Sequence, residues 1–247
     1  MSANAVPWVT RAVVLVSLAS GLAACASATS PTSPAAPATS SPRASPTHGS
    51  TGHEGAEAPT DPSVSLPTYG YYATLQDPAI RAAPFTLTDQ HGEPYRFDPA
   101  RDDAAITLLY FGYTNCPDLC PSELATVATA LRNVPDAVAD QVRMVFVSVD
   151  PARDGVARMA EYMPLFDPTF VGLTGDDAVI RRAQVSHGLE PAERVGEGED
   201  YAMRHAAEVL AFTDDGRVHL VFPFGMTVLQ WEHDLWKLIQ TGWREPR

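Results

Sequence analysis

The folded part of the chain is marked by a regular change in the spacing of its apolar residues. Three continuous apolar runs predict strands buried on both faces, because such strands need no alternation of polar and apolar positions. After each run, apolar residues recur three and four positions apart, which is the spacing of one helical face. The predicted strands are 105–113, 142–150 and 169–175, and the predicted helices begin at Pro121, near Val156 and at Asp177.

Antiparallel strand pairs are predicted on both sides of this alternating region. Residues 84–97 contain two short strands around the turn at 89–92, and residues 208–223 form a hairpin that turns at 214–216. A last helix is predicted at 231–243. This order predicts a single α/β domain with a central mixed β-sheet flanked by helices, and a thioredoxin-like arrangement fits it.

Composition and charge narrow the class of function. The chain has 247 residues, 45% of them hydrophobic, which is enough for a substantial core. Its formal net charge is -13. We therefore expect no nucleic acid and no anionic membrane surface as the main partner. An acidic surface would suit a cationic partner or a metal ion, although most acidic proteins are simply soluble.

The N-terminus has the pattern of an export signal. Arg11 precedes the apolar run 12–19, and the run is too short for a comfortable membrane-spanning helix. The sequence Leu-Ala-Ala-Cys that ends at Cys25 resembles a bacterial lipobox. We predict a signal peptide over 1–25, lipidation of Cys25 and a membrane-anchored protein on the extracytoplasmic face. A plain secretory signal with an incidental cysteine is the alternative.

The segment after the signal is expected to be a disordered linker. Residues 26–70 consist mainly of Ala, Ser, Thr, Pro and Gly, with almost no large apolar side chains, so they cannot bury enough surface to offset the entropy of ordering. The folded domain is then expected over 71–247. His48 and His53 lie in the linker, where solvated residues are expected rather than a metal site.

Two cysteines carry the candidate chemistry of the domain. Cys116 and Cys120 follow a predicted buried strand where the chain turns into a helix, and sites in α/β sheets favour that edge. Their four-residue separation brings both side chains to one face. A helix N-terminus is expected to stabilise their thiolates. From the residues alone, the pair could form a structural disulfide, act as a redox dithiol or hold a metal.

Several motifs resemble those of the Sco/SenC family of copper-binding proteins. They are YFGYTNCPDLCPSEL, then VSVDPARD, then VGLTG, then a histidine before an apolar strand, and the resemblance covers about residues 80–242. It implies a thioredoxin-like fold and copper held by the two motif cysteines and a distal histidine. It also implies a role in assembling the dinuclear copper centre of cytochrome c oxidase, whose copper-bearing subunit would be the partner. Asn115 departs from the family, which often has histidine there.

The resemblance also implies which histidine completes the site. His205, just before the strand expected near residue 208, corresponds to the ligand histidine of the family. Two thiolates and one imidazole suit Cu(I), and can also hold Cu(II). The competing histidines are expected to have ordinary structural roles; they are His91, His187, His219 and His233.

Residues around the predicted copper site are expected to support it without binding metal. Asp118, between the cysteines, could tune the site, contact a partner or favour the helix start. Asp150 and Arg153 are expected to order a loop nearby through an arginine–carboxylate pair. Met203 could be an extra soft donor or could pack beside the site. The segment 187–204 is expected to be a mobile loop in the absence of metal.

Three functions are compatible with these residues. The first is a copper metallochaperone. Its partners, besides the oxidase subunit, would be another copper chaperone or a thiol reductant. The second is a membrane-tethered thiol-disulfide oxidoreductase that keeps the cysteines of a target reduced. The third is a peroxidase-like or redox-sensing protein. The three-residue gap between the cysteines differs from the two-residue gap of thioredoxins, and no proline directly precedes residue 208. Copper delivery, rather than enzymatic activity, is the predicted function.

Overall fold

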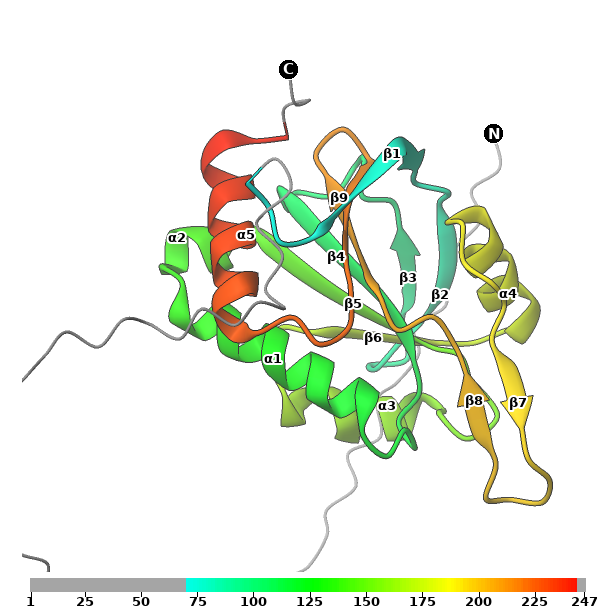
Figure 1. Ribbon diagram of the computed structural model, residues 1–247. Coiled ribbons are helices and arrows are strands. Elements are labelled where there is room, and N and C mark those ends of the chain that lie inside the picture. Colours follow the sequence, from blue (N-terminus) through cyan, green and yellow to red (C-terminus); the bar gives the residue numbers. More distant parts are fainter. Residues whose placement is uncertain (1–69, 244–247) are drawn as a thin grey trace, which may run out of the picture. The chain divides into compact units, whose positions relative to one another are not determined.

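A computed structural model describes residues 70–243, which contain an eight-stranded mixed sheet (Figure 1). The strands lie in the order β1-β10-β9-β4-β5-β6-β2-β3. Their bounds are β1 Thr74–Arg81, β2 Phe85–Asp89, β3 Pro94–Phe97, β4 Ile106–Gly112, β5 Val142–Ser148, β6 Val171–Thr174, β9 Val209–Thr213 and β10 Arg217–Phe222. The predicted fold class, a thioredoxin-like α/β fold with a mixed sheet flanked by helices, is confirmed.

The centre of the sheet is formed by the strands that the apolar runs predict. β4 pairs in parallel with β5, and β5 pairs in parallel with β6, while β9 runs antiparallel to β4 on its other side. Every residue of β4 is buried, as expected for a strand covered on both faces. The chain leaves the core after Gly112, the last residue of β4, and the segment with the two cysteines follows directly.

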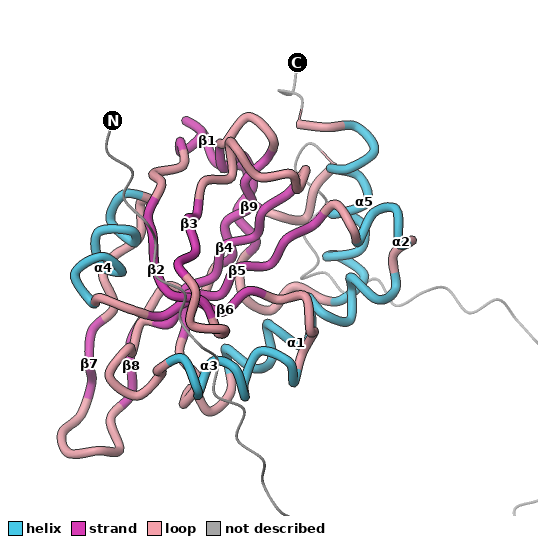
Figure 2. The backbone as a smooth tube through the Cα atoms, turned by 180° about the vertical axis from the view of Figure 1, so that it is seen from behind, coloured by secondary structure: helices cyan, strands magenta, loops and turns pink. Residues whose placement is uncertain are grey.

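Helices cover both sides of this sheet. In Figures 1 and 2, α5 and α4 lie on opposite sides of the strands, and α1 packs along α5. The apolar spacing of α1 is explained by the burial of Leu124, Val127 and Leu131 in the core. The helices are α1 Leu119–Asn133, α2 Asp136–Ala139, α3 Val156–Tyr162, the short 3-10 helix η1 Met163–Leu165, α4 Asp177–Ser186 and α5 Val228–Thr241.

The start of α1 differs from the sequence-based expectation. The helix begins at Leu119 rather than at Pro121, because the backbone N–H of Ser122 already donates to the carbonyl of Asp118. Pro121 lies in the first helical turn, where its missing N–H removes no helical hydrogen bond. Cys120 is consequently a helical residue, and Cys116 precedes the helix.

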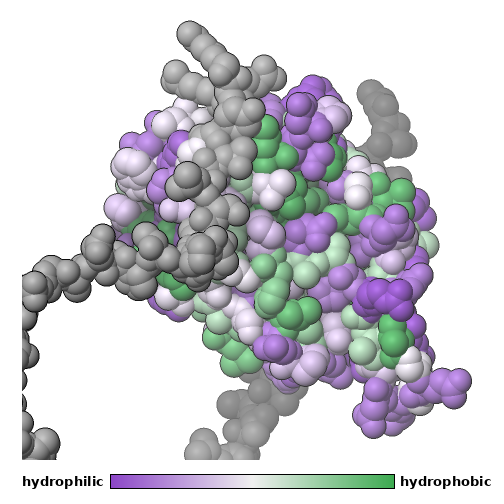
Figure 3. All heavy atoms as spheres, viewed as in Figure 1, coloured by the Kyte–Doolittle hydropathy of each residue, from purple (hydrophilic) through white to green (hydrophobic). Residues whose placement is uncertain are grey.

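A two-stranded hairpin stands apart from the main sheet. β7 (Glu193–Val195) pairs with β8 (Ala202–Arg204), where the sequence predicts a loop over 187–204. We call residues 193–204 the hairpin arm. It projects beyond the body of the domain in Figure 1, and the same projection is covered by hydrophilic residues in Figure 3. Its mobility in the absence of metal stays a prediction.

No helix among residues 70–243 is long and apolar enough to cross a membrane. The predicted signal peptide, Cys25 and the linker histidines lie outside the residues that the structure describes.

Candidate metal centre

The two cysteines lie between the end of β4 and the first turn of α1. The backbone N–H of Cys116 donates to the carbonyl oxygen of Tyr113 over 3.2 Å, which closes a tight turn after the strand. The backbone N–H of Cys120 donates to the Sγ of Cys116 over 3.4 Å, so the helix start fixes the first sulfur. Both residues are free thiols, Cys116 8% exposed and Cys120 fully buried.

A glycine at the end of β4 allows the close approach of the second sulfur. A Cβ atom added at Gly112 would lie 2.9 Å from the Sγ of Cys120 and 2.6 Å from the ring of Phe146. Any side chain there would push Cys120 out of its position or displace the aromatic ring. Glycine in the YFGYT sequence thus makes room for the sulfur.

His205 approaches the cysteines from a distant part of the chain, directly after β8. Its Nε2 lies 3.4 Å from the Sγ of Cys120. On the other side of the ring, Nδ1–H donates to the carbonyl of Ala206 over 2.7 Å. In the neutral ring this bond places the proton on Nδ1 and leaves the lone pair of Nε2 facing the sulfur. In that tautomer Nε2 is free to bind a metal.

The ligand atoms of Cys116, Cys120 and His205 all lie within 4.8 Å of one another. Donor atoms around a trigonal metal with bonds of about 2.2 Å are about 3.8 Å apart, so small side-chain movements would close the site around an ion. It is the one group of three or more Cys, His, Asp or Glu residues among those described that is arranged to hold a metal.

Burial decides the protonation states of the metal-free site. It raises the pKa of the Cys120 thiol to about 12, while hydrogen bonding from the backbone at Tyr113 lowers it only in part. The expectation that the helix N-terminus stabilises this thiolate is therefore wrong for Cys120, because desolvation outweighs the hydrogen bonds that lower its pKa. Burial also lowers the pKa of His205, so its imidazole is neutral and able to coordinate a metal.

Aromatic rings form the wall behind the imidazole. Tyr113 meets His205 edge-on with ring centres 5.7 Å apart, and Tyr110 does so at 6.2 Å. Both tyrosines are buried, and burial raises the pKa of each hydroxyl. These ring contacts pack against the imidazole and hold it in place beside the sulfur of Cys120.

The supporting residues that the sequence singles out occupy different places. Asp118 is exposed at the start of α1, where it accepts a hydrogen bond from the hydroxyl of Ser122 over 3.3 Å. Asp150 and Arg153 form an ion pair in the loop after β5. Met203 is partly buried and packs against the core.

The competing histidines lie outside the cysteine cluster, and the side chains of three of them have partners elsewhere. His187 is fully buried and accepts a hydrogen bond from the backbone N–H of Ala83 over 3.1 Å. His219 and His233 each pair with a carboxylate, and His91 is exposed in the turn after β2. None of these four histidines belongs to the cysteine cluster, in which the histidine is His205.

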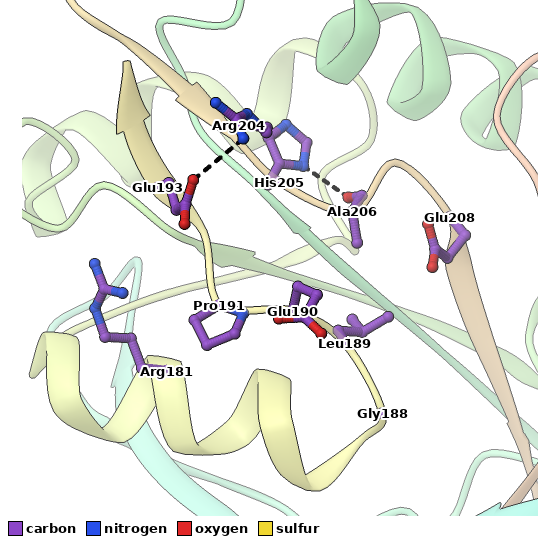
Figure 4. Close-up of a pocket in the computed structure, with 10 residues that line it drawn as sticks. All are labelled: Arg181, Gly188, Leu189, Glu190, Pro191, Glu193, Arg204, His205, Ala206 and Glu208. Carbon is purple, nitrogen blue, oxygen red and sulfur yellow. Dashed lines mark hydrogen bonds and ion pairs between the residues drawn. The ribbon is translucent and has the colours of Figure 1, made fainter. Parts of the chain in front are cut away.

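A pocket of about 670 Å³ opens beside His205. Figure 4 shows it between the end of α4 and the segment that leads into β9, with an ion pair between Arg204 and Glu193 at its edge. Glu190 and Glu208 also line it. The sulfur atoms do not line this pocket, so His205 is the one member of the cluster that reaches it.

Comparisons with known proteins agree with this arrangement. The family model described as SCO1/SenC matches residues 73–240. The chain is 43% identical over 109 residues to Protein sco1 of Schizosaccharomyces pombe, a match that covers 44% of this chain and 40% of that protein. It is 30% identical over 156 residues to a putative copper-binding protein of Stutzerimonas stutzeri, covering 62% of this chain and 76% of the other.

A solved structure supports the same relationship. Bradyrhizobium japonicum ScoI with copper bound is 38% identical, with a TM-score of 0.57, over 64% of this chain and 99% of the other. The chain spans less than half the length of the fission-yeast protein. Because the family model covers well over half of the sequence and the fold agrees, the chain belongs to the SCO1/SenC family.

Proposed function

We propose that this protein binds one copper ion through Cys116, Cys120 and His205 and delivers it to the dinuclear copper site of cytochrome c oxidase. The observation that carries the proposal is the convergence of two sulfur atoms and one imidazole nitrogen within 4.8 Å. The copper-bearing subunit of the oxidase is the proposed acceptor, and another copper chaperone or a thiol reductant prepares the site for loading.

The donor set favours copper over other metals. Thiolate sulfur is a soft ligand that selects Cu(I), and imidazole suits both oxidation states of copper. A structural zinc site usually has four protein ligands, and the described cluster offers three. Two thiolates alone can hold Cu(I), whereas Cu(II) gains more from the nitrogen donor. The site therefore suits a cargo that changes oxidation state.

The relatives supply independent support for this metal. The Bradyrhizobium ScoI structure contains copper, and the Stutzerimonas relative is named for copper binding. The link to cytochrome c oxidase rests on the resemblance of the cysteine motif and the VSVDPARD segment to the Sco/SenC family.

Delivery can be tested in cells that depend on this protein for oxidase assembly. We expect Cys116→Ala and Cys120→Ala to lower the copper content and the activity of the oxidase, because each removes a ligand. His91→Ala is the matched control, since His91 is exposed and lies outside the cluster. Normal copper loading of the oxidase with either cysteine variant would overturn delivery by this site.

The protein is further proposed to be anchored to the membrane through a lipid on Cys25, with its domain on the extracytoplasmic face. Export and anchoring follow from the apolar run and the Leu-Ala-Ala-Cys sequence. Cys25→Ser should release the protein from the membrane fraction or block its processing. Normal processing with full membrane retention would contradict lipidation.

A thiol-disulfide oxidoreductase is the second candidate, favoured by the adjacent free thiols of Cys116 and Cys120. In this role the less buried Cys116 would attack a target disulfide, and Cys120 would resolve the mixed disulfide by forming an internal one. The target gains two electrons, and the protein must be reduced again by an external thiol. Rapid reduction of disulfide substrates by a reduced protein that binds no copper would favour this role.

A further inference from the structure

Tyr201 occupies a place in the hairpin arm that connects it to both the domain body and the metal centre. It directly precedes β8, and β8 directly precedes His205. Only three residues therefore separate the tyrosine from the imidazole. Any contact that fixes Tyr201 also limits where His205 can lie.

The hairpin arm has little to hold it in place by itself. β7 and β8 have three residues each and form a two-stranded sheet separate from the eight-stranded one. Of the six residues between them, 196–200 are exposed and Tyr201 is half-buried. An isolated two-stranded hairpin is marginally stable in water. Contacts with the rest of the domain must therefore determine its position.

The side chain of Tyr201 makes such contacts with the loop after β5. Its hydroxyl donates to the Oδ1 of Asp150 over 2.6 Å. Its ring lies between two guanidinium groups, with Arg153 3.5 Å and Arg194 3.8 Å from the ring centre. A cation over each face and a hydrogen bond at the edge fix the orientation of the ring.

The backbone of the arm is held by the same loop. Nη1 of Arg153 donates to the carbonyl of Tyr201 over 2.9 Å and to that of Glu199 over 3.2 Å. Nε of Arg153 donates to Oδ2 of Asp150. Asp150, Arg153 and Tyr201 therefore form one connected group, which we call the latch.

The latch is built on a rigid part of the fold. Asp150 is 3% exposed, and its carbonyl accepts from the backbone N–H groups of Arg153 and Asp154 over 3.1 and 2.9 Å. The hydroxyl of Ser148, at the end of buried β5, accepts from the N–H of Asp150 over 3.0 Å. The arm is thus connected to a central strand rather than to a second flexible loop.

We propose that Tyr201 is a positioning residue that, through the latch with Asp150 and Arg153, holds His205 against the two cysteine sulfurs and so adapts the site to Cu(II). The inference rests on the copper-binding function proposed above. Without the latch, ordering the arm would cost conformational entropy whenever His205 binds the metal. Cu(I) held by two thiolates is much less affected, because it does not need the imidazole.

The test uses Tyr201→Phe in the full-length chain, because this variant keeps the ring and removes only the hydrogen bond to Asp150. Competition titrations should show Cu(II) binding weakened about tenfold and Cu(I) binding changed by less than about threefold. The thiolate-to-Cu(II) absorption should also decrease. In the metal-free protein, amide hydrogen exchange should become faster over 196–204.

Tyr95→Phe is the matched control, because Tyr95 lies on β3 at the far edge of the sheet. It should leave Cu(II) affinity and the exchange of the arm unchanged. If Tyr201→Phe binds Cu(II) like the wild type while His205→Ala does not, the latch has no such role and copper binding stands. Equal weakening of Cu(I) and Cu(II) would also overturn the inference. Failure of the wild type to bind copper would instead refute the proposed function itself.

Discussion

The protonated state of Cys120 ties copper binding to the release of a proton. Burial raises the pKa of this thiol to about 12, so near neutral pH the sulfur carries hydrogen. A metal binds the thiolate, and protons therefore compete with copper at this atom. The Nε2 atom of His205 lies 3.4 Å from this sulfur, so both ligand atoms face the place where copper would bind.

We predict that the affinity for Cu(I) rises with pH between 6 and 8. Each proton released on binding should strengthen the apparent affinity about tenfold per pH unit. Proton release during a copper titration in weak buffer measures the number directly. Cys120→Ala should release fewer protons than the wild type. An affinity that does not change with pH would show that the cysteines are already thiolates.

Glu123 is a buried carboxyl group in α1 that no pattern in the sequence indicates. It is 1% exposed, and its Oε1 makes no hydrogen bond of normal geometry, although the indole of Trp231 and the backbone of Gly225 lie nearby. Burial raises its pKa from 4.5 to about 7. The folded protein therefore keeps a proton that the unfolded chain loses in this interval.

We predict that this group makes the folded state less stable as pH rises from about 4.5 to 7, by at most about 1.4 kcal/mol per pH unit. Glu123→Gln should remove this part of the pH dependence, because the amide has the shape of the acid and no charge. The variant should be more stable than the wild type at pH 8. Denaturant unfolding of the reduced, metal-free protein at several pH values measures the free energy of unfolding. Glu161→Gln, at an exposed residue, is the control.

At the scale of elements, α5 holds the start of the described domain. Asp234 is fully buried in this helix, and its carboxylate accepts from the backbone N–H groups of Tyr72 and Ala73 over 3.1 and 2.7 Å. These contacts join residues 162 and 161 positions apart, and they lie just before edge strand β1. One side chain thus fixes where the first strand enters the sheet.

Asp234→Ala should lower the free energy of unfolding by about 2–4 kcal/mol, because it leaves two buried N–H groups without their charged acceptor. Thermal or denaturant unfolding measures the change. Asp177→Ala is a suitable control, since Asp177 is exposed and its ion pair with Arg181 lies on the surface. A loss below about 0.5 kcal/mol in the Asp234 variant would show that these hydrogen bonds are replaced by water.

The elements that the sequence predicts are those with long apolar patterns. β4, β5 and the β9–β10 hairpin follow from such runs. β1 was missed because it contains Pro78 and has no buried residue, as an edge strand paired only with β10 can. β7 and β8 were missed because three exposed or half-buried residues leave no hydrophobic pattern. β1 forms by pairing with a strand far along the chain, and β7 and β8 form by pairing with each other, so backbone pairing rather than an apolar pattern specifies these strands.

The site was predictable only in part from spacing. The four-residue separation places both cysteines at one strand end, but nothing local connects them to His205, which was indicated by the family resemblance and by its place just before a predicted strand. Tyr201 and Glu123 had no signal in a single sequence. The sequence also suggested a thiolate at the helix start, because it could not show that Cys120 is fully buried.

In the whole molecule, the predicted linker is expected to set how far the domain extends from the membrane and to contribute nothing to the stability of the domain. Residues 30–60 lie outside the described part of the chain and contain few side chains able to form a core. We predict that deleting them leaves the unfolding midpoint and the copper stoichiometry of the domain unchanged. Calorimetry and metal analysis measure both. A lower midpoint would show that the segment is an integral part of the fold.

We expect Cys116, Cys120 and His205 to bind one copper ion together. The most direct measurement is X-ray absorption of the full-length protein loaded with Cu(II), combined with metal analysis and compared with each single alanine variant. We predict one copper per chain with two sulfur neighbours and at least one imidazole nitrogen. His205→Ala should lose an imidazole neighbour, and each cysteine variant should lose a sulfur. A wild-type spectrum with oxygen and nitrogen neighbours only, unchanged in all three variants, would contradict copper binding by these three residues.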